Sequence, residues 1–139
     1  MKATPLIARV LLGVVFVVAG CLKGMSPYHS VMTVGGFELT PHWLSFVAGI
    51  TLPGVEVLTG VALLSGVFVR GAGLVAVGLG AIFSVGVVSV MARRIDIDCG
   101  CFGHLPITPR AGWGTLSFDL ALVALGLIVM FSARRAQLR

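Results

Sequence analysis

The sequence predicts an all-α integral membrane protein, a bundle of four transmembrane helices with both termini in the cytoplasm. Hydrophobic residues make up 58% of the 139-residue chain and charged residues only 11%, whereas soluble domains carry charge at about 25% of positions. Four apolar segments are each long enough to supply the roughly 20 helical residues that cross a hydrocarbon core. The length predicts one membrane domain over residues 1–139, with no separate soluble module.

The four spans are expected at about residues 6–22, 43–69, 71–92 and 113–133. Backbone polar groups in lipid must pair within their own segment, so each span is expected to be a helix. Only Val69-Arg70-Gly71 separates the second span from the third, which predicts a tight helical hairpin. Polar loops at about residues 23–42 and 93–112 make the other two connections, both on the side opposite the termini.

Lysine and arginine predict the orientation, because cytoplasmic segments carry the excess of both. The side of the termini holds six of them, Lys2, Arg9, Arg70, Arg134, Arg135 and Arg139. The loop side holds four, Lys23, Arg93, Arg94 and Arg110, offset by Glu38, Asp96 and Asp98. We therefore expect the long loops outside the bacterial cytoplasmic membrane, although Arg93-Arg94 directly after the third span argues the other way.

The net charge of +5 does not indicate nucleic-acid binding, because no basic patch with interleaved aromatic residues is present. It is better explained by topology and by anionic lipid headgroups. Glycine is abundant, with 19 residues concentrated in the apolar segments. Small residues allow close helix packing in lipid, and such faces are also compatible with a homo-oligomer.

Cys99-Gly100-Cys101, in the second polar loop, is the strongest chemical signal in the chain. A disulfide requires Cα atoms about 4.4–6.8 Å apart, and Gly100 is the residue that turns most freely between two cysteines. The small ring is expected to be strained and easily reduced, which suits dithiol–disulfide exchange. Asp98 disfavours a neighbouring thiolate, whereas Arg93 and Arg94 would favour one.

Two other interpretations of the thiols are open. They could be buried and inert, or they could bind a metal with His104, joined by His29 or His42 from the other loop. Structural zinc usually has four ligands with wider cysteine spacing, so redox chemistry is preferred and no metal site is assigned.

Cys21, near the outer end of the first span, is a candidate resolving thiol that would attack a mixed disulfide. The alternative is a small apolar packing residue. Val18-Ala19-Gly20-Cys21 also has the pattern of a lipoprotein cleavage site after a basic start and an apolar run. Lipidation is disfavoured, because the remainder of the chain is itself polytopic.

Two carboxylates, Glu56 and Asp119, fall inside predicted spans, where a charge is costly and usually functional or partnered. Pro53, one turn before Glu56, removes a helix hydrogen bond. Glu56 could donate to a freed carbonyl, pair with Lys23 or handle protons. Asp119, close below the thiol loop, could exchange a proton during thiol chemistry or bind loop backbone amides.

These residues together resemble the MauE branch of the DoxX-like membrane proteins. The pattern is Ala19-Gly20 followed by Lys23, then Pro53-x-x-Glu56, then Asp98-Cys99-Gly100-Cys101-Phe102-Gly103. One departure is Phe118-Asp119, where the family pattern has Arg-Asn. The resemblance implies a four-helix membrane protein that handles disulfides outside the cytoplasm alongside a thioredoxin-like partner.

Cysteine placement restricts the mechanism independently of the resemblance. No cysteine lies on the predicted cytoplasmic side, so thiols of this chain cannot alone relay electrons from the cytosol. The remaining route leads sideways to a quinone in the bilayer, which would make the protein a quinone-linked oxidoreductase acting on a thioredoxin-like protein or a disulfide-containing client. The alternatives are a non-enzymatic adaptor that docks a partner by mixed disulfide, a metal-binding membrane protein and, less favoured, a transporter.

Overall fold

The structure, a computed structural model, describes residues 3–100 and 110–138. The described residues form five helices, α1 (Ala3–Gly24), α2 (Pro27–Gly36), α3 (His42–Ser65), α4 (Val69–Ala92) and α5 (Trp113–Gln137). All except α2 are long and apolar enough to cross a membrane. The four predicted spans are thus confirmed, and the chain is a multi-pass membrane protein.

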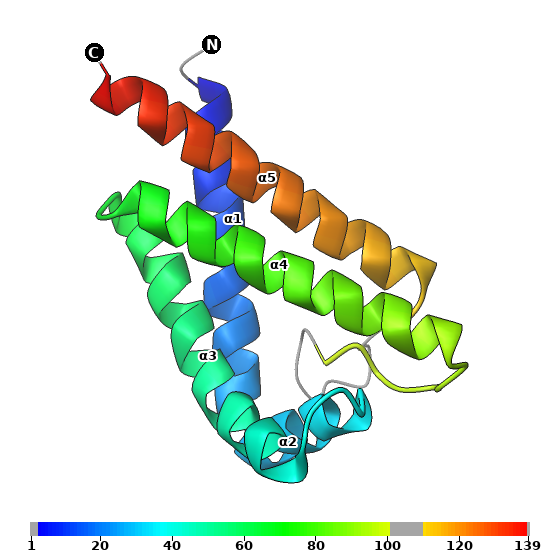
Figure 1. The fold of residues 1–139 in the computed structure, drawn as a ribbon. Helices are drawn as coiled ribbons and strands as arrows, with labels where there is room; N and C mark the ends of the chain where they lie inside the picture. Colours follow the sequence, from blue (N-terminus) through cyan, green and yellow to red (C-terminus); the bar gives the residue numbers. More distant parts are fainter. Residues whose placement is uncertain (1–2, 101–109, 139) are drawn as a thin grey trace.

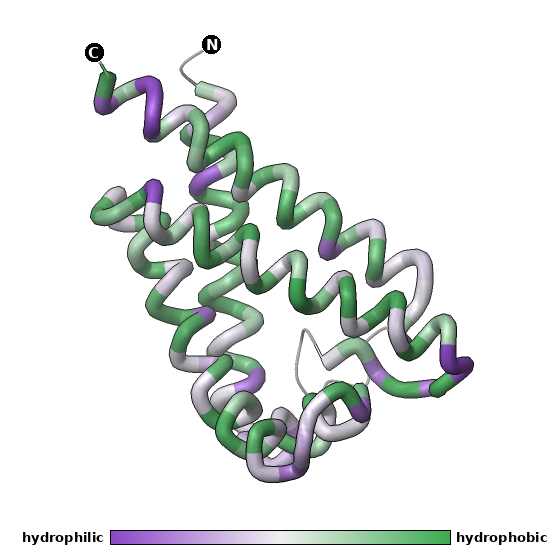
Figure 2. The backbone as a smooth tube through the Cα atoms, in the orientation of Figure 1, coloured by the Kyte–Doolittle hydropathy of each residue, from purple (hydrophilic) through white to green (hydrophobic). Residues whose placement is uncertain are grey.

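Both ends of the described chain lie at one end of the bundle together with the turn between α3 and α4, and α2 lies at the other end (Figure 1). Apolar residues run along the four long helices, whereas polar residues gather mainly at the helix ends (Figure 2). Many large apolar side chains on the outside are exposed, including Leu58, Leu74 and Ile82. In water this would be a severe cost, but in lipid it is the expected outer surface.

The long helices associate as two pairs. α1 packs most extensively on α3, and α4 on α5, whereas the contacts between the pairs are smaller. Each pair therefore joins two consecutive spans, whereas α3 and α4, which the short turn connects, belong to different pairs.

Glycines allow the close approach of α1 and α3. A Cβ atom at Gly20 would lie 2.8 Å from the carbonyl oxygen of Pro53, and one at Gly60 would lie 2.7 Å from that of Gly13. Real Cβ atoms are not found so close to backbone, so larger residues would push the helices apart. This contact confirms the packing role expected for at least these glycines.

The turn between α3 and α4, residues 66–68, lies nearer the N-terminus than expected. α3 ends at Ser65, earlier than the predicted Val69, because Gly66 adopts a left-handed φ of 79° and its N–H donates to the Ala62 carbonyl. Phe68 also has positive φ and α4 begins directly after it. The prediction of a tight hairpin is confirmed, with its turn three residues towards the N-terminus.

The first polar loop contains α2, which the sequence analysis did not predict. Pro27 occupies the first turn of this helix, where its missing N–H costs nothing. α2 lies against α3 so closely that a Cβ atom at Gly49 would be 2.6 Å from the Cα atom of Val31. The helix forms a partial cap over the end of the bundle, and this position brings it beside the cysteine loop.

Candidate functional site

A buried ion pair joins α1 to α3. Lys23 Nζ lies 2.6 Å from Glu56 Oε1, and the two side chains are only 7% and 2% exposed. Removing two charges from water is costly unless they pair closely. The pair is therefore a strongly coupled unit inside the bundle. Lys23 is the partner of Glu56 at that depth.

The local sequence positions this pair. α1 and α3 run antiparallel, since Gly13 packs on Gly60 and Gly20 packs between the Pro53 carbonyl and the Val57 N–H. Glu56 therefore lies at the level of Gly20, and Lys23, nearly one turn further along α1, reaches it because helical side chains tilt towards the N-terminus. Pro53 itself is buried in α3, at the level where the two backbones meet.

The second helix pair contributes an aromatic ring and a second carboxylate. Lys23 Nζ lies 4.7 Å from the centroid of the Phe83 ring of α4, which is a cation–π geometry. Asp119 of α5 is completely buried. Lys23, Glu56, Phe83 and Asp119 line one cavity of about 20 Å³, which is enough for about one water molecule.

One cation and two carboxylates therefore meet in an apolar interior. Glu56 Oε2 is buried and accepts no hydrogen bond from the residues that the structure describes. Such an arrangement is suited to holding or passing a proton, because an extra negative charge there is poorly solvated.

Cys99 and Gly100 of the cysteine loop lie beside the same region, at the end of the bundle that carries α2. Cys99 is 6% exposed, and Gly100 adopts a φ of +71°. A side chain at Gly100 would collide with Thr33 of α2. The glycine is thus required both for the turn and for the close contact with α2, as the interpretation of Cys99-Gly100-Cys101 anticipated for the turn.

A second cavity, of about 30 Å³, connects this loop to the ion pair. Cys99, Gly100, Thr33, Lys23 and Phe83 are among the residues that line it. Lys23 and Phe83 line both cavities, so they form the partition between them. Two small internal spaces, separated by Lys23 and Phe83, thus lie between Cys99 and the carboxylates of Glu56 and Asp119.

Contacts outside the cavities hold the loop in place. Arg93 donates to the Phe37 carbonyl and lies 3.6 Å from Glu38, which attaches the end of α4 to the segment after α2. The backbones of Asp98 and Arg110 pair as an isolated antiparallel β-bridge. Arg93, which was expected to act on the thiols, is thus engaged in a structural contact.

A family model described as "Methylamine utilisation protein MauE" matches residues 1–132. The chain belongs to the MauE family. Comparison with curated proteins and with solved structures finds no match. The resemblance inferred from the sequence is thereby confirmed over nearly the whole chain.

The MauE-like residues of the sequence converge in space. Gly20 and Lys23 of α1 meet Pro53 and Glu56 of α3, and Cys99 lies across one cavity from Lys23. Asp119, where the sequence departs from the expected MauE pattern, lines the neighbouring cavity. Residues that are far apart in the chain thus form one site in this MauE protein.

Other sequence-predicted residues fall elsewhere. Cys21 is exposed and lines neither cavity. Cys101 and His104 lie outside the described residues. Within residues 3–100 and 110–138, no three His, Cys, Asp or Glu side chains gather as metal ligands.

Sequence reasoning missed two members of this MauE site, Phe83 and Thr33. Lys23 was expected as one possible partner of Glu56, and the structure shows that pair. Phe83 carries no signal, because it is one apolar residue in an apolar helix. Thr33 belongs to α2, which was itself not predicted.

Proposed function

We propose that this MauE protein is a membrane-embedded thiol–disulfide oxidoreductase whose reactive pair is Cys99 and Cys101. The observation that carries the proposal is the pair of cavities between Cys99 and the carboxylates of Glu56 and Asp119. Thiol oxidation releases protons as well as electrons, and a buried lysine with two carboxylates beside a cysteine is suited to accept them.

The proposed reaction has two balanced steps. A dithiol on an extracytoplasmic thioredoxin-like protein or client is oxidised to a disulfide, and the Cys99–Cys101 disulfide is reduced to two thiols. A membrane quinone then takes two electrons and two protons from these thiols, which restores the disulfide and yields quinol. The protons pass through the group formed by Lys23, Glu56 and Asp119.

Access for a partner is supported by an open groove at the same end of the bundle. Its cavity volume is about 320 Å³, and Met32, Thr33, Asp96, Asp98 and Arg110 are among its lining residues. Thr33 lines both this groove and the cavity at Cys99. A partner seated there would lie directly beside Gly100.

The side of the membrane is part of the proposal. In the sequence, six basic residues and none of the three cysteines fall on the predicted side of the termini, which supports cytoplasmic termini and an extracytoplasmic cysteine loop in a bacterial inner membrane. Labelling of Cys99 in intact cells by a membrane-impermeant thiol reagent after mild reduction tests this placement.

The deciding experiment uses purified protein, a short-chain ubiquinone and a reduced thioredoxin-like protein. Quinol formation, followed by absorbance, is expected for the wild-type chain and should be lost in Cys99→Ser. Cys101→Ser should instead accumulate a mixed disulfide between Cys99 and the partner. The proposal is overturned if the wild-type chain forms the partner adduct but no quinol, because that result identifies a docking adaptor.

A further inference from the structure

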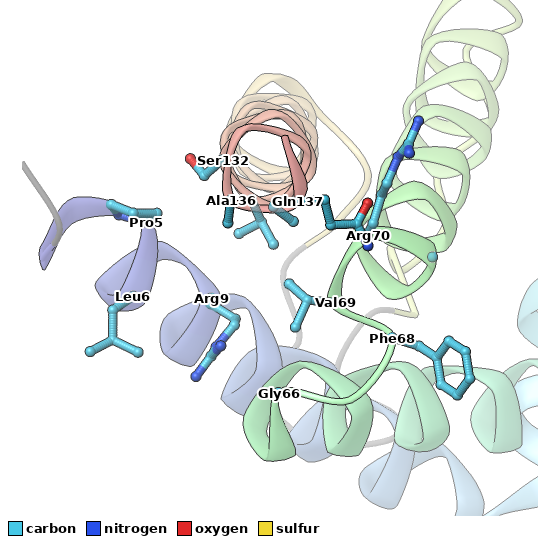
Figure 3. Close-up of a pocket in the computed structure, with 13 residues that line it drawn as sticks. Pro5, Leu6, Arg9, Gly66, Phe68, Val69, Arg70, Ser132, Ala136 and Gln137 are labelled. Atoms are coloured by element: carbon cyan, nitrogen blue, oxygen red, sulfur yellow. The ribbon is translucent and has the colours of Figure 1, made fainter. Parts of the chain in front are cut away.

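A cavity at the opposite end of the bundle has features of an anion site. It has a volume of about 550 Å³, within the range of about 300–1,000 Å³ that is usual for small-ligand sites. Figure 3 shows its three walls, formed by Pro5, Leu6 and Arg9 of α1, the turn from Gly66 to Arg70, and Ser132, Ala136 and Gln137 of α5. The cysteine site lies at the other end, so the two are separate.

Arg9 is the central feature of this cavity. It stands about 9 Å along α1 from the first described residue, and its guanidinium lies beside the end of α3, where Nη1 would be 3.4 Å from a Cβ atom at Gly66. Its Nε is buried and donates to no acceptor among the residues that the structure describes. A half-buried guanidinium whose Nε is left without an acceptor favours an anion.

The chain offers no acidic side chain to neutralise this end. Its five acidic residues are Glu38, Glu56, Asp96, Asp98 and Asp119, all within the bundle or at the end with α2. Arg70 also lines the cavity, and Arg134 and Arg135 stand in the last turns of α5. The local charge from side chains is therefore strongly positive, with no acidic side chain to offset it.

We propose that this cavity binds a phosphate group through Arg9 and Arg70. The planar guanidinium matches two phosphate oxygens at once, and Ser132 and Gln137 supply further polar groups at the wall. Leu6, Val69 and Val129 give the rest of the lining an apolar character. The phosphate comes either from an anionic lipid headgroup or from free inorganic phosphate, and the apolar lining favours the lipid.

The test measures binding to the delipidated full chain in an uncharged detergent by native mass spectrometry. The probes are phosphatidylglycerol, phosphatidylcholine and inorganic phosphate. Phosphatidylglycerol is expected to bind with one preferred copy, and Arg9→Gln should weaken that binding by about tenfold or more, as expected for loss of a charge-assisted contact. Arg9→Lys should give an intermediate loss.

Arg134→Gln is the matched control, because it removes the same charge from the same end but does not line the cavity. It should change affinity by less than about twofold. If Arg9→Gln does not fold, Arg70→Gln, at an exposed position, provides the second cavity variant. Circular dichroism and gel filtration report folding of each variant.

The outcomes separate the two sources of phosphate. Binding of phosphatidylglycerol that inorganic phosphate does not displace supports the lipid headgroup. Arginine-dependent binding of inorganic phosphate supports the free anion. The proposal is overturned if phosphatidylcholine binds as well as phosphatidylglycerol, if neither lipid nor phosphate binds, or if Arg9→Gln and Arg134→Gln have equal effects.

Discussion

Lys23 and Cys99 line the same cavity, although α2, α3 and α4 separate them in the sequence. Lys23 is also paired with Glu56 at 2.6 Å, so the ammonium lies between the cysteine loop and the carboxylate.

Breaking the ion pair should destabilise the bundle strongly. Glu56→Gln and Lys23→Met each leave one buried charge without its partner, which costs about 3–5 kcal/mol in buried pairs. The double variant should be less destabilised than the sum of the two, because it leaves neither charge behind. Unfolding in detergent gives the free energies, and additive losses would show that the two side chains are not coupled.

Asp119→Asn distinguishes a proton-handling aspartate from a structural one. Asparagine retains the shape and hydrogen-bonding capacity of the side chain but cannot take up a proton. Quinol formation should fall by about a hundredfold, while formation of the partner mixed disulfide continues. Glu38→Gln, at an exposed position outside both cavities, is the control; Arg93 keeps its hydrogen bond to the Phe37 carbonyl in this variant, so turnover should stay within about twofold of wild type. Unchanged turnover in Asp119→Asn would assign the residue to structure alone.

Gly20→Ala should separate α1 from α3, because the new Cβ would lie 2.8 Å from the Pro53 carbonyl. The expected loss is about 1–3 kcal/mol of unfolding free energy, as for other overpacked contacts. Gly54→Ala is the matched control in α3, since nothing lies within 4 Å of its Cβ position. This variant should be neutral or stabilising by up to about 1 kcal/mol. Equal effects of the two variants would argue against the close contact.

Gly100→Ala should impair thiol exchange. Alanine at a φ of +71° is strained by about 1–2 kcal/mol, and its Cβ collides with the Thr33 methyl. Thr33→Ser removes that methyl and retains the hydroxyl that donates to the His29 carbonyl at 2.9 Å. The double variant should therefore recover part of the activity lost in Gly100→Ala. The reaction of Cys99 with the thioredoxin-like protein is the measurement, and no recovery would exclude the collision as the cause.

Cys21→Ser should leave quinol formation within about twofold of wild type, because the exposed Cys21 lines neither cavity and such surface changes are usually mild. Accumulation of a mixed disulfide at Cys99 in this variant would instead establish Cys21 as the resolving thiol. Gel mobility without reductant reports that adduct.

Hydropathy predicted the four spans because lipid imposes one requirement on every residue of a span. The intramembrane charges Glu56 and Asp119 were recognisable as single residues for the same reason. Their shared cavity was not predictable, because it depends on how α1, α3, α4 and α5 cross. The sequence pattern contained Lys23 and Pro53-x-x-Glu56, but only the contact between Gly20 and Pro53 explains why these fragments meet.

The helix α2 was missed for a different reason. It has only ten residues, with two glycines at its end, and isolated helices shorter than about 12–15 residues are marginal in water. Its stability comes from packing on α3, where the absence of a side chain at Gly49 lets the backbone of Val31 approach closely. Local propensity cannot report such a tertiary contribution, so Thr33 was not expected beside the cysteines.

The two helix pairs, α1 with α3 and α4 with α5, meet along an interface that we call the seam. Lys23 and Glu56 belong to one pair, and Phe83 and Asp119 belong to the other. Because the contacts across the seam are smaller than those within each pair, a slight rocking of one half against the other is the least costly deformation of the bundle. Such a hinge motion would widen or close the space between the ammonium and Asp119, so the geometry of proton transfer would follow the relative tilt of the two halves.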